Sequence, residues 1–268
     1  MPQHTRVIIT DLDGTLLNNN HSISDFTKQV FQELYLEDYL FIVATGRHHL
    51  DALPLVEKLG VPLYLVTSNG ARIHSPNKQL MYAKNMNPQK VASILSLHFD
   101  TEVTMVMFKE DYWQTNQVNE KLNSFQKVVT YHPQIVDFKS ITDFEAIKIF
   151  FSHDDHQKLQ KIQQQILELH PNEFNHAFSL PICLEFMDKT VDKSHAIAQI
   201  LAKEGYTFYE TISFGDGFND EKMLLASHKA CIMGNAPLSL KEKLAHLEVI
   251  QTNHQDGVAT YLNQYFLV

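Results

Sequence analysis

The sequence predicts an α/β protein, with a doubly wound parallel sheet interrupted by a second domain of α+β type. Short apolar runs alternate with amphipathic helices near both ends of the chain, a pattern typical of a parallel sheet covered on both faces. The middle of the chain is instead rich in short strands. We therefore expect a discontinuous core, residues 1–84 and 188–268, flanking an inserted domain, residues 85–187.

Strand and helix alternate in the first core segment. Phe26, Val30 and Leu34 recur at helical spacing after Ser24, which is a good N-cap residue, and Gly60 ends a second helix. The predicted strands are Val7–Thr10, Leu40–Ala44 and Leu63–Val66, and the predicted helices are Ser24–Leu36 and His48–Leu59.

The inserted domain changes to a pattern of hairpins and isolated helices. Its predicted strands are Thr101–Phe108, Tyr112–Thr115, Ala146–Ser152, Phe174–Ser179 and Ile182–Phe186, and its predicted helices are Asn116–Phe125 and Asp154–His170. The parallel pattern then resumes and ends in a helical tail. The expected elements are helix His195–Glu204, strand Thr211–Phe214, helix Glu221–Ala226 and strand Ala230–Met233.

Composition limits the classes of function. The chain has 268 residues, of which 22 are basic and 31 acidic, for a formal net charge of −9. Such a balance does not favour nucleic acid as a partner. We expect no membrane partner and no signal peptide, hence a cytoplasmic protein, because the apolar runs are short and residues 1–6 are polar. The two cysteines, Cys183 and Cys231, are expected as buried thiols, and the protein as a monomer or weak homo-oligomer.

Small, polar or acidic residues follow each of four predicted core strands. In a doubly wound sheet, ligands bind beyond the carboxyl ends of the strands, so these turns should meet in one crevice. The turns are Asp11–Thr15, Thr45–Arg47, Thr67–Gly70 and Gly215–Asp220.

Convergence of these turns would gather four carboxylates, those of Asp11, Asp13, Asp216 and Asp220. Carboxylates at such short distances repel one another, and a divalent cation relieves the repulsion. Because all the ligand atoms are oxygens, Mg²⁺ is the cation that suits them best. The sequence therefore predicts a magnesium site at this edge of the sheet.

Groups that bind phosphate lie beside this predicted metal site. Thr45 and Asn219 can hydrogen-bond phosphate oxygens, as can the backbone N–H groups around Gly14 and Gly46, and Lys193 supplies a positive charge. Each motif alone has a plain structural explanation, as a turn, a helix cap or a surface lysine. Together they indicate a phosphoryl-transfer site.

The stretches "DLDGTLL", "ATGR", "TSNGA" and "FGDGFNDEKML" occur in this order along the chain. In this order they resemble the motifs of the haloacid dehalogenase-like (HAD) phosphatases, and more narrowly of the Cof-type branch. The resemblance covers nearly the whole chain. It implies a Rossmann-like core with an α/β cap inserted between the second and third family motifs. The sequence is also similar to bacterial members of the family that act on sugar phosphates and pyridoxal phosphate.

The resemblance implies roles for the aspartates. Asp11 matches the nucleophile and a Mg²⁺ ligand. Asp13 matches the general acid/base, whose backbone carbonyl also binds Mg²⁺. Asp216 matches the last protein ligand of the metal, and Asp220 a water-mediated metal contact.

The remaining family positions match phosphate-binding residues. Thr45 and Gly46 correspond to the phosphate-binding turn, Lys193 to the lysine that bridges nucleophile and phosphate, and Asn219 to a phosphate contact. The chain departs from the family after this lysine, where Ser194 replaces the usual glycine. A serine can cap the helix that begins there.

These matches imply a Mg²⁺-dependent phosphatase that hydrolyses small phosphorylated metabolites, such as sugar phosphates or pyridoxal phosphate, through an aspartyl-phosphate. The cap would exclude water and contact the substrate. The candidate rim residues are Arg47, His48, Arg72 and Glu185. Two alternatives remain open: a phosphomutase acting on a hexose phosphate, and a non-catalytic phosphate-binding module.

Overall fold

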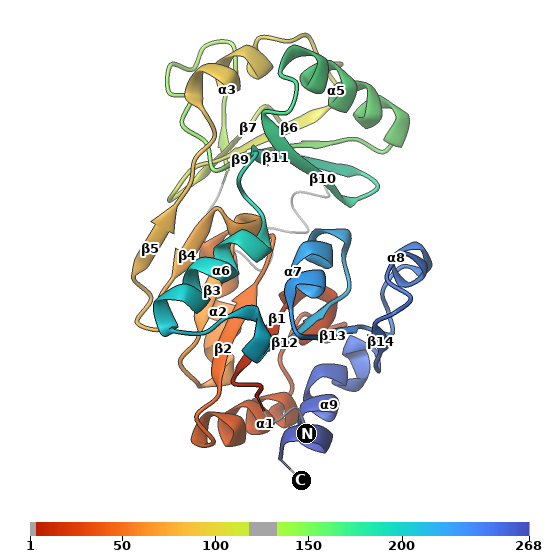
Figure 1. The fold of residues 1–268 in the computed structure, drawn as a ribbon. Coiled ribbons are helices and arrows are strands. Elements are labelled where there is room, and N and C mark those ends of the chain that lie inside the picture. Colours follow the sequence, from red (N-terminus) through yellow and green to blue (C-terminus); the bar gives the residue numbers. More distant parts are fainter. Residues whose placement is uncertain (1–3, 118–132, 268) are drawn as a thin grey trace. The chain divides into compact units, whose positions relative to one another are not determined.

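The chain divides into two compact units in the computed structural model, which describes residues 4–117 and 133–267 (Figure 1). The core unit comprises the residues up to Tyr82 and those from Asp192 onward, and the inserted unit is Ala83–Val191. The sequence placed these divisions after residues 84 and 187, a few residues from where they lie.

A largely parallel sheet forms the centre of the core unit. Its described strands run in the order β14-β13-β12-β1-β2-β3-β4-β5. Neighbouring strands from β14 to β3 are parallel, and β4 is antiparallel to β3. The predicted α/β class is confirmed. The strands are β1 (Val7–Thr10), β2 (Leu40–Ala44), β3 (Tyr64–Thr67), β4 (Arg72–His74), β5 (Leu80–Ala83), β12 (Thr211–Gly215), β13 (Lys229–Ile232) and β14 (Glu248–Val249).

Helices cover both faces of this sheet because successive strand side chains point to opposite sides. Ile8 of β1 belongs to one apolar cluster, together with Phe31 of α1 and Leu262 of α9. Ile9, the next residue, belongs to another cluster with Ile197 of α6. The first face carries α1 (Asp25–Leu36), α2 (His49–Val56) and α9 (Gly257–Phe266), and the second carries α6 (Lys193–Glu204) and α7 (Glu221–Ala226).

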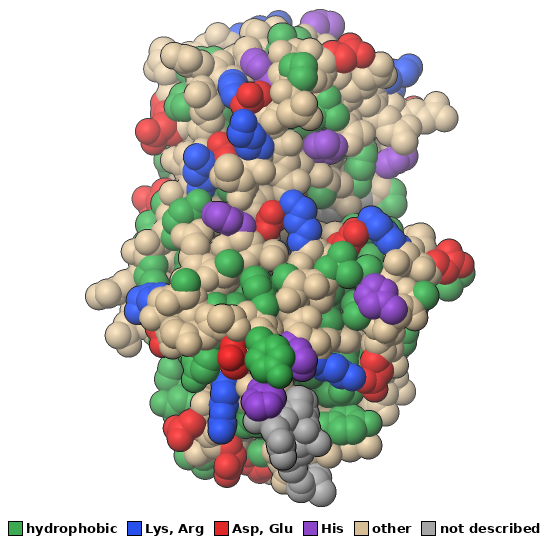
Figure 2. All heavy atoms as spheres, viewed as in Figure 1, with side chains coloured by type: hydrophobic (Ala, Val, Ile, Leu, Met, Phe, Trp, Pro, Cys, Tyr) green, Lys and Arg blue, Asp and Glu red, His purple; other side chains and the backbone are tan. Residues whose placement is uncertain are grey.

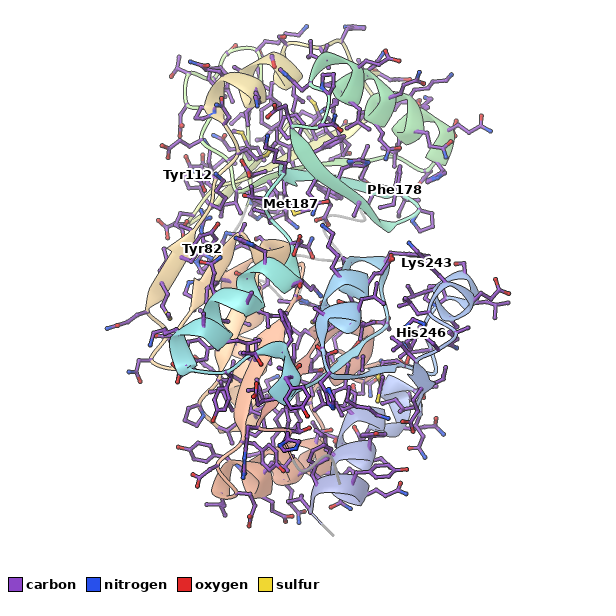
Figure 3. The ribbon with its side chains drawn as sticks, in the orientation of Figure 1. Tyr82, Tyr112, Phe178, Met187, Lys243 and His246 are labelled. Atoms are coloured by element: carbon purple, nitrogen blue, oxygen red, sulfur yellow. The ribbon has the colours of Figure 1, made fainter. Side chains whose placement is uncertain are left out.

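The short helix α8 (Leu238–Lys243) is tied to α7. Leu240 of α8 packs in one apolar cluster with Leu224 of α7. Lys243 lies at the end of α8 (Figure 3). It pairs with Glu221, with 2.7 Å between the Lys243 Nζ and the Glu221 Oε2. These contacts hold α8 against the helix that follows β12.

Helix starts confirm one prediction and correct two. Ser24 caps α1, since its hydroxyl accepts a hydrogen bond from the Thr27 N–H at 3.0 Å. The second helix begins at His49 rather than His48, which is its N-cap, and it gives way at Val56 to a tight turn that Gly60 ends at φ 70°. Helix α6 begins at Lys193 and is capped by Asp192, so the expected cap at Ser194 is wrong.

The inserted unit has the predicted α+β character. Its described strands run in the order β10-β11-β9-β6-β7-β8, and neighbouring strands are antiparallel except β7 and β8, which are parallel. Helices α3 and α5 lie on one face of this sheet (Figure 1). The elements are α3 (Pro88–Leu95), β6 (Thr104–Phe108), β7 (Trp113–Thr115), β8 (Gln134–Ile135), β9 (Lys148–Ser152), α5 (His156–Leu169), β10 (Phe174–Leu180) and β11 (Cys183–Asp188).

Some elements were not predicted, namely α3 and the short strands β4, β5, β8 and β14. Of the predicted helix Asn116–Phe125, the first two residues are not helical, and the others lie outside the described residues. Cys183 and Cys231 are buried, as expected.

The described chain contains no helix that is long and apolar enough to cross a membrane. Acidic, basic and histidine side chains are interspersed over the face shown in Figure 2.

Candidate active site

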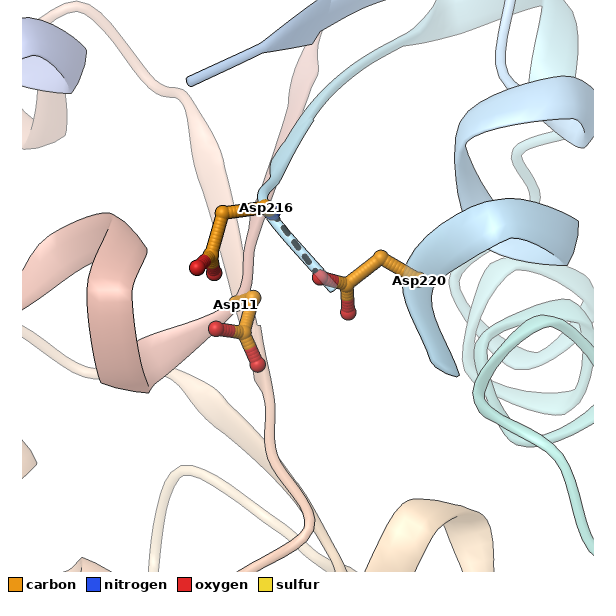
Figure 4. Close-up of side chains that lie close together, drawn as sticks. All are labelled: Asp11, Asp216 and Asp220. Atoms are coloured by element: carbon orange, nitrogen blue, oxygen red, sulfur yellow. Dashed lines mark hydrogen bonds between the residues drawn. The ribbon is translucent and has the colours of Figure 1, made fainter. Parts of the chain in front are cut away.

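Strands β1 and β12 bring two of the predicted motifs to one edge of the sheet. The strands pair in parallel, with Thr10 opposite Phe214, and the Asp11 N–H donates to the Phe214 carbonyl at 2.9 Å. Asp11 and Asp216 therefore leave the sheet side by side. One carboxylate oxygen from each of Asp11, Asp216 and Asp220 lies within 4.8 Å of the other two (Figure 4).

Lys193 joins this acidic cluster from the first turn of α6. Its Nζ donates to Oδ1 of Asp11 at 2.5 Å and to Oδ1 of Asp220 at 2.6 Å. The lysine is 1% exposed, so both contacts are shielded from water. One lysine thus faces three carboxylates in a buried site.

The excess of negative charge perturbs the acids. Burial, followed by the charge of Asp220, raises the pKa of Asp11 well above its usual value, although Lys193 opposes the change. Burial and the charge of Asp220 raise the pKa of Asp216 to about 6. Burial alone would lower the pKa of Lys193, but its two carboxylate partners raise it. A further cation at the cluster would relieve this repulsion.

The donor set fits the predicted magnesium ion. Mg²⁺ prefers hard oxygen ligands and binds through one or two carboxylates together with phosphate and water. Asp11 and Asp216 would supply those carboxylates. The side chain of Asp13 does not belong to the described group of converging acids.

Asp220 holds the turn that carries Asp216. Its Oδ2 accepts hydrogen bonds from the N–H groups of Asp216, at 3.0 Å, and of Gly217, at 2.9 Å, while its Oδ1 binds Lys193 (Figure 4). Asp220 is 1% exposed. It therefore fixes the position of both a predicted ligand and the lysine.

Three residues from other loops position Asp216. Thr15 donates to its Oδ1 at 2.9 Å, and Asn235 Nδ2 lies 3.4 Å from its Oδ2 and 2.7 Å from the Gly14 carbonyl oxygen. Gly14 has φ 73°, and a Cβ there would lie 2.3 Å from Asp216 Oδ2, so only glycine fits. The sequence reasoning missed Asn235, although it lies just after β13, at the same edge of the sheet as the predicted motifs.

The predicted phosphate-binding turns are also in contact with one another. Asn219 Nδ2 donates to Asn69 Oδ1 at 3.0 Å, which links the turn after β12 to the turn after β3. A Cβ on Gly46 would lie 3.2 Å from the same Asn69 oxygen, so the turn after β2 is adjacent as well. Thr45 accepts a hydrogen bond from the Arg47 N–H at 3.1 Å, and its hydroxyl proton can still be donated.

Arg47, predicted at the substrate rim, contacts the predicted acid/base. Its guanidinium donates from Nε to Oδ2 of Asp13, at 2.7 Å, and from Nη2 to Oδ1, at 2.6 Å. Its neighbour His48 is buried, and His48 Nδ1 accepts a hydrogen bond from the Leu50 N–H.

The other two rim candidates are also buried rather than exposed. Arg72 is 1% exposed, and its Nη1 donates to the Ala71 carbonyl at 2.8 Å. Glu185 belongs to the inserted unit, where its Oε2 accepts from Lys148 Nζ at 3.0 Å. Contact of these two residues with a substrate stays a prediction.

Comparison with protein families identifies the class. The model of the haloacid dehalogenase-like hydrolases matches residues 8–262. The chain therefore belongs to this family of enzymes, as the resemblance predicted, and the match includes the motifs that form the acidic cluster.

Proteins of other organisms align with nearly the whole length of this chain. A protein of Buchnera aphidicola subsp. Baizongia pistaciae, whose name assigns it provisionally to the phosphatases, is 34% identical over 261 residues, which cover 97% of this chain and 98% of that one. The HMP-PP phosphatase of Serratia proteamaculans is 31% identical over 261 residues, 97% and 95% of the two chains. A HAD subclass IIB sugar phosphatase has the same fold, with a TM-score of 0.84, 21% identity and coverage of 98% and 100%.

Proposed function

We propose that this protein is a Mg²⁺-dependent phosphatase that hydrolyses monoesters of small phosphorylated metabolites through an aspartyl-phosphate on Asp11. The observation that carries the proposal is the cluster of Asp11, Asp216, Asp220 and Lys193, all buried except the half-buried Asp216, in which carboxylates outnumber the lysine. Burial of such an excess is costly for folding, and metal binding and phosphoryl transfer are functions that require it.

In the first half of the reaction, an oxygen of Asp11 attacks phosphorus in line with the leaving group. Lys193 contacts Oδ1 of Asp11, so we assign the attack to Oδ2. The phosphoryl group passes to Asp11, and Asp13, as a carboxylic acid, gives its proton to the departing alkoxide, which leaves as an alcohol. Lys193, Thr45 and Asn219 would bind the phosphoryl oxygens.

In the second half, water attacks the phosphorus of the aspartyl-phosphate. Asp13, now a carboxylate, takes a proton from that water. Inorganic phosphate leaves, and Asp11 regains its carboxylate while Asp13 regains its proton. A Mg²⁺ ion held by Asp11 and Asp216 would supply positive charge opposite the phosphoryl oxygens in both halves.

The names of similar proteins support the choice of substrate class. One is an HMP-PP phosphatase, and a protein of the same fold is a sugar phosphatase. We therefore propose sugar phosphates and pyridoxal phosphate as the first compounds to assay, with the inserted unit acting as a cap that contacts the part of the substrate beyond the phosphate.

The test is phosphate release from a panel of sugar phosphates, pyridoxal phosphate, nucleotides and flavin mononucleotide, each with Mg²⁺ or with EDTA. We expect release from at least one small phosphate ester, and only with Mg²⁺. Conversion of a hexose 1-phosphate to its 6-phosphate without free phosphate would instead show a mutase. Stable phosphorylation without turnover would show a binding module.

A further inference from the structure

The ion pair between Asp13 and Arg47 has a geometry that surface ion pairs rarely have. Two guanidinium nitrogens each donate to a different oxygen of one carboxylate, at 2.7 and 2.6 Å. Bidentate pairs of this kind fix the plane of the carboxylate as well as its position, and are stronger than single contacts. Arg47 thus constrains the orientation of Asp13.

The backbone of Arg47 is itself held on both sides. Its N–H donates to Thr45 Oγ1 at 3.1 Å, and its carbonyl accepts from the Ser68 N–H at 2.8 Å. The guanidinium therefore projects from a fixed point between β2 and α2. Its side chain is 23% exposed, whereas that of Asp13 is 41% exposed.

A second basic side chain near Asp13, that of His21, is more weakly placed. His21 Nδ1 lies 3.9 Å from Asp13 Oδ1, and its side chain is 67% exposed. That distance is beyond a hydrogen bond, and an exposed contact of this kind contributes little. Of these two basic residues, Arg47 therefore makes the contact that orients the Asp13 carboxyl group.

We propose that Arg47 is a positioning residue that holds the side chain of Asp13 in the orientation needed for hydrolysis of the aspartyl-phosphate. The inference rests on the proposed function, since it needs an aspartyl-phosphate on Asp11. In that step a water O–H bond breaks, its proton goes to Asp13, its oxygen bonds to phosphorus, and the bond between phosphorus and Asp11 breaks. The two bonds fix the plane of the Asp13 carboxyl group and leave its outer lone pairs for the water.

Phosphoenzyme decay isolates this step. The protein is labelled with p-nitrophenyl [³²P]phosphate, whose leaving group needs no proton, and label on the enzyme is followed by acid quench. We expect Arg47→Met to slow the decay by about 10- to 100-fold, within the range of a general base, and Arg47→Lys to lie between it and wild type. Lys58→Met, which removes an exposed positive charge nearby in the sequence, is the control and should match wild type.

A double-mutant cycle separates positioning of Asp13 from direct contact with the substrate. If Arg47 acts through Asp13, then Arg47→Met slows decay by less than about 2-fold when Asp13 is already Asn, because coupled residues are not additive. Additive losses, a raised KM at unchanged decay rate, or wild-type decay in Arg47→Met would each overturn the inference. Absence of any phosphoenzyme in the wild type would instead overturn the proposed function.

Discussion

Buried charges are compensated differently in the two units. In the inserted unit, Lys148 and Glu185 lie on the adjacent strands β9 and β11, and their opposite charges cancel across 3.0 Å. In the core unit, Lys193 pairs with Asp11 and Asp220, and Asp216 lies beside these two carboxylates, so that the described cluster has more carboxylates than cations. A balanced pair is compatible with a purely structural role, whereas an unbalanced cluster has a cost that folding does not explain. The balance of charge therefore distinguishes a buried ion pair with a structural role from a cluster with a chemical one.

The largest expected effect follows loss of the proposed nucleophile. Asp11→Asn removes the attacking carboxylate but keeps its size, so kcat should fall by about 1,000-fold or more. Circular dichroism and the melting temperature should stay close to wild type, because a neutral residue there relieves repulsion. Asp25→Asn, at an exposed position in the first turn of α1, is the matched control. Substantial turnover by Asp11→Asn, free of contaminating phosphatase, would refute the assignment.

Removing Lys193 and Lys148 in turn sharpens the comparison. Lys193→Met and Lys148→Met should each cost about 3–5 kcal/mol in the free energy of unfolding, because each leaves buried carboxylates without their partner. Added Mg²⁺ should restore part of the loss in Lys193→Met but none in Lys148→Met, since the described ion pair of Lys148 has one carboxylate, that of Glu185. Denaturant unfolding with and without Mg²⁺ measures both effects. If Mg²⁺ restored the free energy of unfolding equally in the two variants, the proposed difference between the two sites would be wrong.

Magnesium should also stabilise the wild-type protein. Binding to the folded state alone adds about 2.7 kcal/mol when the ion is present at 100 times its Kd. Thermal melts with Mg²⁺ against EDTA should show this increase, and Asp216→Asn should lose it while Asp25→Asn keeps it. An equal shift in Asp216→Asn would place the ion elsewhere.

The smallest effect concerns Asn235. Asn235→Ala removes a donor that lies 3.4 Å from Asp216 Oδ2, so the affinity for Mg²⁺ should fall by about 10- to 100-fold. The variant should therefore lose activity at low Mg²⁺ concentration and regain most of it at saturating Mg²⁺. Activity measured over a range of Mg²⁺ concentrations tests this, and a loss that saturating metal does not correct would rule out a role through Asp216.

The sequence predicted the elements whose own residues determine them. β1, β2 and α7 have their predicted bounds because buried apolar runs and helical periodicity are local signals. Strands β8 and β14 have only two residues each and present no local pattern; their neighbours in the sheet define them. The start of α6 was misplaced because Asp192 competes with Ser194 as a cap.

Local sequence signals also predict only part of the candidate site. Strand ends identified the turns of Asp11 and Asp216, since topology alone brings such ends together. No spacing rule pairs Arg47 with Asp13, because that contact depends on how a long side chain extends from one turn to another. The burial of Arg72 and Glu185 is likewise not a local signal, because charged side chains are usually exposed and tertiary packing buries these two. Their contact with the substrate stays a prediction.

The central claim is that the unbalanced carboxylates hold a divalent cation. Anomalous diffraction from crystals soaked in Mn²⁺, which takes the same oxygen ligands as Mg²⁺, tests it most directly. The account predicts a peak at about 2.0–2.3 Å from oxygens of Asp11 and Asp216. A crystal soaked to saturation with Mn²⁺ that shows no anomalous peak between these two side chains would contradict the claim.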